Sequence, residues 1–163
     1  MVSRAATPAD AAAMAAIYNE GIEDRVATFE TRPRTADDVR SWFDARHPLV
    51  VVTDEADGVI AWASTSAYRS RACYAGIAEC SVYVARRARG RGAGRMALEA
   101  LIEAARKAGF WKLLSRIFPE NHASRALVRS AGFREVGFYE HHARLDGVWR
   151  DVVIVEHIIR ENL

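Results

Sequence analysis

The sequence has little cysteine, few prolines and no long apolar run, and each scarcity excludes a class of protein. Two cysteines, Cys73 and Cys80, among 163 residues are too few for a disulfide framework or a structural zinc site. The longest apolar run near the N-terminus, residues 11–18, is far shorter than the roughly 20 residues that cross a bilayer, and no signal-peptide core precedes it. We therefore expect a cytoplasmic protein with no membrane partner.

A large excess of one charge is also missing, since 23 basic and 21 acidic residues leave a formal net charge of +2. Dedicated nucleic-acid binders carry a lopsided charge, so we expect no nucleic-acid partner. What is present is a hydrophobic content of 50%, which is enough to bury a core. With no repeat, low-complexity tract or linker, residues 1–163 are expected to form a single domain.

Hydrophobic periodicity predicts four helices and six strands. Helices are expected at residues 7–24, from residue 35 past residue 43, and at residues 92–108 and 121–131, and strands at residues 49–53, 59–68, 76–84, 111–118, 133–142 and 148–159. The pairs Asp57-Gly58 and Asp146-Gly147 predict hairpin turns. Hairpins followed by βαβ crossovers predict an α/β fold, with a mixed, mostly antiparallel sheet flanked by helices.

The segment from Arg86 to Arg95 carries the strongest chemical signal. It contains five arginines and three glycines between a predicted strand and a predicted helix. The glycines let the backbone approach a ligand, the helix start adds its dipole, and the arginines add full charges, so the segment is typical of a pyrophosphate site. The alternative is an arginine-rich solvated turn. No Gly-Lys-Ser/Thr triplet marks a P-loop, and no dinucleotide fingerprint follows the first strand.

Two segments resemble the GCN5-related N-acetyltransferases (GNAT). Arg89-x-x-Gly92-x-Gly94 resembles the Gln/Arg-x-x-Gly-x-Gly/Ala signature with which that family cradles the pyrophosphate of acetyl-coenzyme A, and the predicted element order is similar as well. Asn121, followed by Gly132-Phe133, resembles the next segment of the family. The resemblance covers nearly the whole chain and implies a GNAT fold, an acetyl-coenzyme A-dependent enzyme and no metal. The cofactor-binding residues that it implies are Val82, Tyr83, Val84, Arg89, Gly90, Arg91, Gly92, Ala93, Gly94, Arg95, Asn121 and Ser124.

The resemblance also implies roles in the chemical step. Backbone N–H groups at residues 82–84 would contact the pantetheine arm and stabilise charge on the thioester oxygen. Many family members protonate the departing thiolate with a tyrosine, but the matching position here is Val128. Tyr139, His141, His142 and solvent remain alternative proton donors.

A narrower resemblance points to the phosphinothricin acetyltransferase branch. It rests on residues 17–20, 28–31, 71–74, 79–84 and 149–152, and the closing residues 144–151 are most similar to members that acetylate arsinothricin. That branch acetylates the α-amino group of phosphinothricin, methionine sulfoximine, arsinothricin and related amino acids. The resemblance therefore implies a small amino-acid substrate and a homodimer. A role in antibiotic or herbicide resistance, a role in amino-acid salvage and an incidental activity all fit such a substrate.

Five residues are expected at the acceptor side of this site. Glu79 is the candidate general base, because a carboxylate can take the proton of an attacking amine; the alternative is an ordinary solvent-facing strand residue. Arg71 and Tyr74 match the branch's substrate clamp, where a guanidinium grips an oxyanion. By the same resemblance Phe29 walls the pocket, and Glu30 holds the substrate amine or caps a turn.

Other interpretations stay open at this level. The acceptor could be a peptide N-terminus, a lysine or an aminoglycoside, and the chain could be a non-catalytic acetyl-coenzyme A-binding module. His141-His142 lacks a third ligand at suitable spacing, so we expect no metal site. The four tryptophans are expected in the core.

Overall fold

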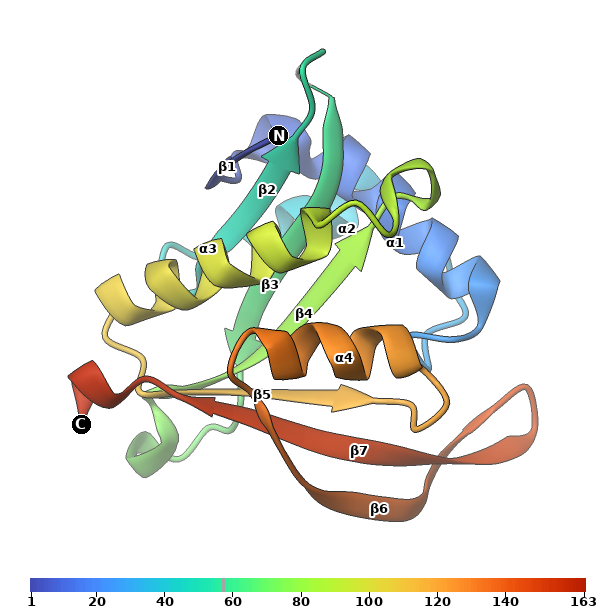
Figure 1. The fold of residues 1–163 in the computed structure, drawn as a ribbon, viewed down its shortest axis with the longest axis vertical. Helices are drawn as coiled ribbons and strands as arrows, with labels where there is room; N and C mark the ends of the chain where they lie inside the picture. Colours follow the sequence, from blue (N-terminus) through green and yellow to red (C-terminus); the bar gives the residue numbers. More distant parts are fainter. Residues whose placement is uncertain (57) are drawn as a thin grey trace.

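The computed structural model describes residues 1–56 and 58–163, and its centre is a seven-stranded sheet (Figure 1). All neighbouring strands are antiparallel except β4 and β5, which are parallel. The predicted mixed, mostly antiparallel α/β fold is therefore confirmed. In spatial order the strands are β1 (Val2–Ala5), β2 (Leu49–Thr53), β3 (Val59–Ala67), β4 (Ile77–Val84), β5 (Lys112–Ile117), β7 (Val148–Ile158) and β6 (Arg134–Leu145).

Helices cover both faces of this sheet. Figure 1 shows α3 and α4 in front of the sheet and α1 and α2 behind it. The α-helices are α1 (Ala11–Asp24), α2 (Ala36–Arg40), α3 (Ala93–Lys107) and α4 (His122–Ser130), and 3-10 turns occupy Pro8–Asp10, Ala72–Tyr74, Arg86–Ala88 and Arg160–Asn162. Within the described residues, no helix is both long and apolar enough to cross a membrane.

A capping box fixes the start of α2. Asp38 N donates to Thr35 Oγ1 at 3.1 Å, and Thr35 N donates to the Asp38 carboxylate at 2.8 Å. α2 nevertheless ends at Arg40, earlier than predicted. The Ser41 hydroxyl donates to Asp38 O at 2.6 Å and Trp42 N donates to Val39 O at 3.0 Å, so the chain continues in tighter turns.

Two further details differ from, or lie outside, the sequence-based expectation. β1 was not predicted, because its four residues are mostly exposed and show no apolar alternation; it is an edge strand held by antiparallel pairing with β2. Of the predicted Asp57-Gly58 turn, Asp57 lies outside the described residues. The other hairpin turn is confirmed, with positive φ at both Asp146 (50°) and Gly147 (78°).

An aromatic cluster anchors α1 to the back of the sheet. The Tyr83 ring of β4 lies 4.9 Å from the ring centroids of both Tyr18 and Trp62, and the Trp62 Nε1 donates to Met14 O at 3.0 Å. Trp62 is buried as expected. Trp149 is 50% exposed, so the expectation of a core position is wrong for this residue, which lies in the β6–β7 hairpin beneath the guanidinium of Arg144.

The two parallel strands pair over only three residues. Glu79 opposite Leu114 is the last pair, after which β4 continues beside β3 while β5 continues beside β7. The sheet therefore opens at this point, and the openings described below lie beside the second half of β4.

Gly76 is expected to be essential for stability. A Cβ at this position would overlap the indole ring of Trp111, whereas a Cβ at Gly137 of β6 would have no atom within 4 Å. We expect Gly76→Ala to lower the free energy of unfolding by about 1–3 kcal/mol, the usual cost of overpacking. Gly137→Ala, the matched control, should change it by less than about 0.5 kcal/mol in the same urea titration. Equal stability of the two variants would contradict the packing role of Gly76.

Candidate functional site

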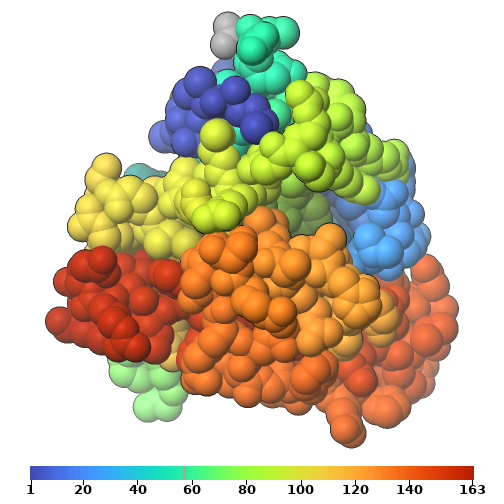
Figure 2. Space-filling view, in the orientation of Figure 1, coloured from blue at the N-terminus to red at the C-terminus, as the bar shows by residue number. Residues whose placement is uncertain are grey.

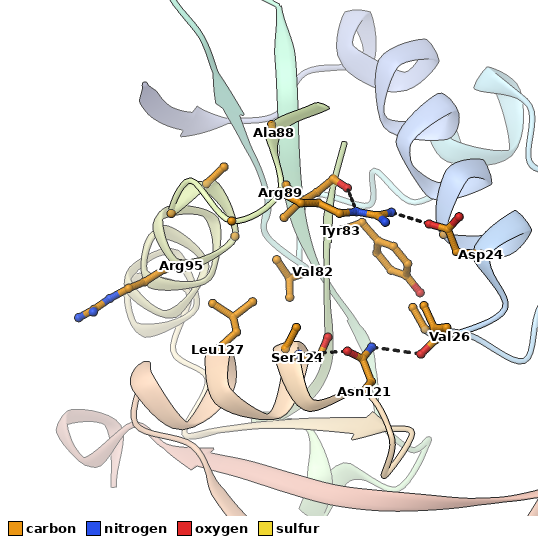
Figure 3. Close-up of a pocket in the computed structure, with 18 residues that line it drawn as sticks. Asp24, Val26, Val82, Tyr83, Ala88, Arg89, Arg95, Asn121, Ser124 and Leu127 are labelled. Atoms are coloured by element: carbon orange, nitrogen blue, oxygen red, sulfur yellow. Dashed lines mark hydrogen bonds and ion pairs between the residues drawn. The ribbon is translucent and has the colours of Figure 1, made fainter. Parts of the chain in front are cut away.

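A cleft of about 430 Å³ opens between the end of α1, the second half of β4, and the starts of α3 and α4 (Figure 3). Figure 2 shows this face of the molecule hollowed between the yellow-green start of α3, orange α4 and the blue segment after α1. The structure brings together at this cleft all of the predicted cofactor residues except Arg91. The lining residues are Gly21, Asp24, Val26, Ala27, Val82, Tyr83, Val84, Ala88, Arg89, Gly90, Gly92, Ala93, Gly94, Arg95, Asn121, Ala123, Ser124 and Leu127.

Glycine backbone forms the floor at the start of α3. Gly92 is the N-cap of this helix with φ 86°, Gly90 has φ 72°, and a Cβ at either position would meet no atom within 4 Å. A Cβ at Gly94 would instead lie 3.1 Å from Val84 and 3.2 Å from Leu127, so close packing with β4 and α4 excludes a larger residue. The first N–H groups of α3, which lack intrahelical partners, can therefore face an anion at close range.

The arginines of this segment are less available than the sequence indicates. Arg89 lines the cleft, but its Nη2 lies 2.7 Å from Asp24 Oδ2, and Arg86 binds the same carboxylate at 2.8 Å. These hydrogen bonds hold the pKa of Asp24 below its usual value. Arg87 pairs with Asp54, and Arg95 pairs with Glu99 and points away from the cleft in Figure 3.

Backbone N–H donors are therefore more available to an anion at this cleft than the arginine side chains are. Of the five arginines in the segment, Arg91 alone has no ion pair within the described part of the chain, and it does not line the cleft. Sequence reasoning missed Asp24, because nothing in the α1 sequence shows that its last turn meets the glycine segment.

Asn121 joins the cleft to the loop after α1. Its Oδ1 accepts from Ser124 N at 3.1 Å, which caps α4, and its Nδ2 donates to Val26 O at 3.1 Å (Figure 3). The amide retains a second N–H for a ligand. The predicted contact with a cofactor is therefore combined with two structural contacts that the sequence did not indicate.

A smaller cavity of about 50 Å³ lies where β4 and β5 part. It shares Ala27, Val82, Tyr83, Asn121 and Ser124 with the larger cleft, and its other lining residues are Ser81, Ser115, Arg116, Ile117, Phe118 and Val128. Burial raises the pKa of Tyr83, so its hydroxyl stays protonated at neutral pH.

The alternative proton donors named from the sequence lie elsewhere. Val128 is buried against the small cavity, at the position where the family's tyrosine was expected. Tyr139, His141 and His142 belong to β6, are exposed, and line neither cavity.

Glu79 lies on β4 at the last residue paired with β5. Its side chain is 31% exposed, and its Oε1 lies 2.9 Å from Nη2 of Arg116. Arg116 was not singled out from the sequence, because only the register of β4 against β5 brings it to Glu79. Arg116 links the carboxylate to the small cavity, which Glu79 itself does not line.

The predicted acceptor residues do not line either cavity. Phe29 packs edge-on against Phe118 with ring centroids 4.8 Å apart, which places it beside the small cavity. Glu30 pairs with Arg34 at 2.7 Å. Arg71 is exposed and lies over the Tyr74 ring at 5.9 Å. The roles of these residues stay predictions.

Comparison with known proteins decides the family. Residues 2–134 match the acetyltransferase (GNAT) domain family. The chain belongs to this family. It is 34% identical to the L-methionine sulfoximine/L-methionine sulfone acetyltransferase of Pseudomonas paraeruginosa, covering 94% of this chain and 91% of the relative.

Two solved structures show the same fold along nearly the whole chain. The ribosomal-protein-alanine N-acetyltransferase of Brucella melitensis has a TM-score of 0.91 at 34% identity, covering 98% of this chain and 100% of that one. A phosphinothricin acetyltransferase of Sinorhizobium meliloti, solved with acetyl-coenzyme A, has a TM-score of 0.89 at 30% identity, covering 96% and 87%.

This GNAT enzyme is an acetyltransferase that uses acetyl-coenzyme A. The cleft fits that co-substrate. The space where a Cβ would stand at Gly90 and Gly92 is empty, which leaves room for a pyrophosphate, and the N-terminus of α3 offers N–H donors to it. No group of three or more metal-ligating side chains occurs among the residues that the structure describes.

Gly92 offers a direct test of the cleft. Gly92→Ala and Gly109→Ala introduce the same methyl at opposite ends of α3, at φ 86° and 85°, with no atom within 4 Å in either case. Both should lose about 1–2 kcal/mol of stability from the left-handed backbone. Only Gly92→Ala should weaken coenzyme A binding, by about tenfold or more in calorimetric titration, because the methyl stands between the anion and its backbone donors. Equal affinities of the two variants would place the pyrophosphate elsewhere.

Proposed function

We propose that this GNAT enzyme transfers an acetyl group directly from acetyl-coenzyme A to the α-amino group of a small amino acid or glutamate analogue. The observation that carries the proposal is the position of Glu79, at the parting of β4 and β5. Its partner Arg116 lines the small cavity, which shares five lining residues with the larger cleft. The choice of acceptor is supported by the names of two relatives, a methionine sulfoximine/methionine sulfone acetyltransferase and a phosphinothricin N-acetyltransferase.

In this proposal the chain's own groups handle protons and charge. Bound acetyl-coenzyme A supplies the thioester whose carbonyl carbon the amine attacks. Glu79 accepts the proton that the amine loses, and the thiolate released when the C–S bond breaks takes a proton from solvent, since Tyr139, His141 and His142 line neither cavity. Backbone N–H groups at residues 82–84, on the side of β4 that β5 has left, stabilise the charge that develops on the carbonyl oxygen.

Four further residues are assigned to placing the acceptor. Phe29, packed on Phe118, walls the apolar side. Arg71 and Tyr74 are assigned to a distal anionic or polar group of the acceptor, and Glu30 to the approach of its amine. A detoxifying, resistance-type role in the cytoplasm is the function that such an activity would serve.

We also propose that the enzyme is a homodimer. Phe138, Tyr139 and Trp149 on the β6–β7 hairpin are each at least half exposed, and β6 is an edge strand. Large exposed aromatic side chains on a sheet edge are typical of an interaction surface.

The reaction is tested by the release of free thiol from acetyl-coenzyme A over a panel of acceptors. The panel contains phosphinothricin, methionine sulfoximine, arsinothricin, methionine sulfone, glutamate and a peptide with an N-terminal alanine. We expect turnover of the glutamate analogues, and a fall in kcat of about 100- to 10,000-fold for Glu79→Gln.

The matched control for this substitution is Glu103→Gln, because Glu103 also pairs with an arginine (Arg106, 2.7 Å) but lies on α3 away from both cavities. It should retain wild-type kcat. Turnover of the peptide alone would contradict the proposed amino-acid acceptor. Full activity of Glu79→Gln would contradict the role of Glu79 as general base.

A further inference from the structure

We infer that Arg116 binds the α-carboxylate of the acceptor and so restricts the enzyme to amines that carry one. The inference rests on the proposed function, because it assumes that an amino acid reaches Glu79. It adds a specificity-determining residue that neither the sequence pattern nor the relatives' names indicate.

Arg116 has the position that this role requires. It lies on β5 two residues beyond Leu114, the last residue paired with β4, and its guanidinium reaches across the opening to Glu79 at 2.9 Å. It is the one arginine that lines the small cavity among the described residues. Its side chain is 43% exposed, so a ligand can reach it.

Arg116 also has donors to spare. A guanidinium carries five N–H donors in a planar fork that matches a carboxylate, and the ion pair with Glu79 uses one nitrogen. Glu79 is its one carboxylate partner within the described part of the chain. The fork can therefore donate to a second carboxylate without rearrangement of the strand.

The charges of the pair complement those of an amino-acid zwitterion. An α-amino acid holds its ammonium and carboxylate on a single carbon, so the two opposite charges arrive as close neighbours. Glu79 and Arg116 present the opposite signs as equally close neighbours, with 2.9 Å between their facing atoms. The acceptor can enter by exchange, with its ammonium on Glu79 and its carboxylate on Arg116. The exposed ion pair is a weak interaction in water, so this exchange costs little.

Two other arginines are engaged differently. Arg150 stacks on the Phe118 ring at 4.3 Å and pairs with Glu120 at 3.3 Å. Arg71 lies over Tyr74, outside the cavity lining. Both can serve a distal group of the acceptor, but neither contacts Glu79, and only the partner of the proposed base can hold the carboxylate next to the reacting amine.

The test compares an acceptor with its α-carboxamide. L-methionine sulfone and L-methionine sulfone α-amide share the side chain and the amine and differ in the carboxylate. Each is assayed at saturating acetyl-coenzyme A with wild type, Arg116→Gln and Arg116→Lys. The amine of the amide titrates at lower pH than that of the acid, so the readout is the ratio of variant to wild-type kcat/KM for each acceptor, which cancels this difference.

We expect Arg116→Gln to lower kcat/KM for the free acid by about 10- to 100-fold, mainly through KM, and to leave the amide nearly unchanged, because only the acid loses a charge-assisted hydrogen bond. Arg116→Lys should recover part of the loss, since it keeps the charge without the fork. Arg106→Gln is the matched control, as it removes an arginine from a similarly exposed ion pair on α3, and it should change neither acceptor.

Three outcomes would overturn the assignment. An equal loss for acid and amide in Arg116→Gln would show that Arg116 only holds Glu79 in place. Unchanged kinetics for both would remove Arg116 from the site and leave the proposed function intact. Absence of any amino-acid turnover by wild-type enzyme would overturn the proposed function and this assignment with it. Thermal unfolding of each variant separates these effects from loss of the fold.

Discussion

The short pairing of β4 with β5 is the constraint on which the rest of the site depends. Three residue pairs join the strands, and beyond Glu79 and Leu114 each strand stays with its other neighbour. Backbone groups of a strand are obligatory hydrogen-bonding groups, so a strand edge left open inside a protein is a place for a ligand's amides to pair. The small cavity, the ion pair and the cofactor cleft all lie beside this opening.

The second organising interaction lies at the end of α1. The Asp24 carboxylate pairs with both Arg86 and Arg89, and this fixes the segment that leads into α3 against the end of α1. The segment's arginines thus hold its shape, while its glycines present backbone donors. A run of basic residues can serve an anion site indirectly, by keeping the peptide groups aligned rather than by supplying the contacts.

Most of the fold could be predicted from the sequence because periodicity and caps are local. The helix start at Thr35, the Asp146-Gly147 turn and the order of every helix and strand except β1 needed only short-range patterns. β1 escaped prediction because its stability comes from pairing with β2 and not from its own apolar residues. α2 ended early because the Ser41 hydroxyl competes for the carbonyl oxygen of Asp38.

In the candidate site, too, local patterns were predictable and long-range contacts were not. The predicted cofactor residues form contiguous segments, and all of them except Arg91 line the cleft, whereas Val26 and Ala27 in the loop after α1 line it without having been predicted. Asp24 and Arg116 act across the sheet or between helices, and their partners are set by strand register and helix packing, which no local pattern encodes.

The double role of Asn121 has a consequence for any attempt to redesign the acceptor. One amide both begins a helix beside the larger cleft and holds the main chain of Val26, three residues before Phe29, the proposed wall of the acceptor site. Substitutions that reshape this loop for a bulkier acceptor will also displace the side-chain amide of Asn121. Selection for a new acceptor alone will then carry an unselected change in affinity for the acetyl donor, and the two properties are best evolved together.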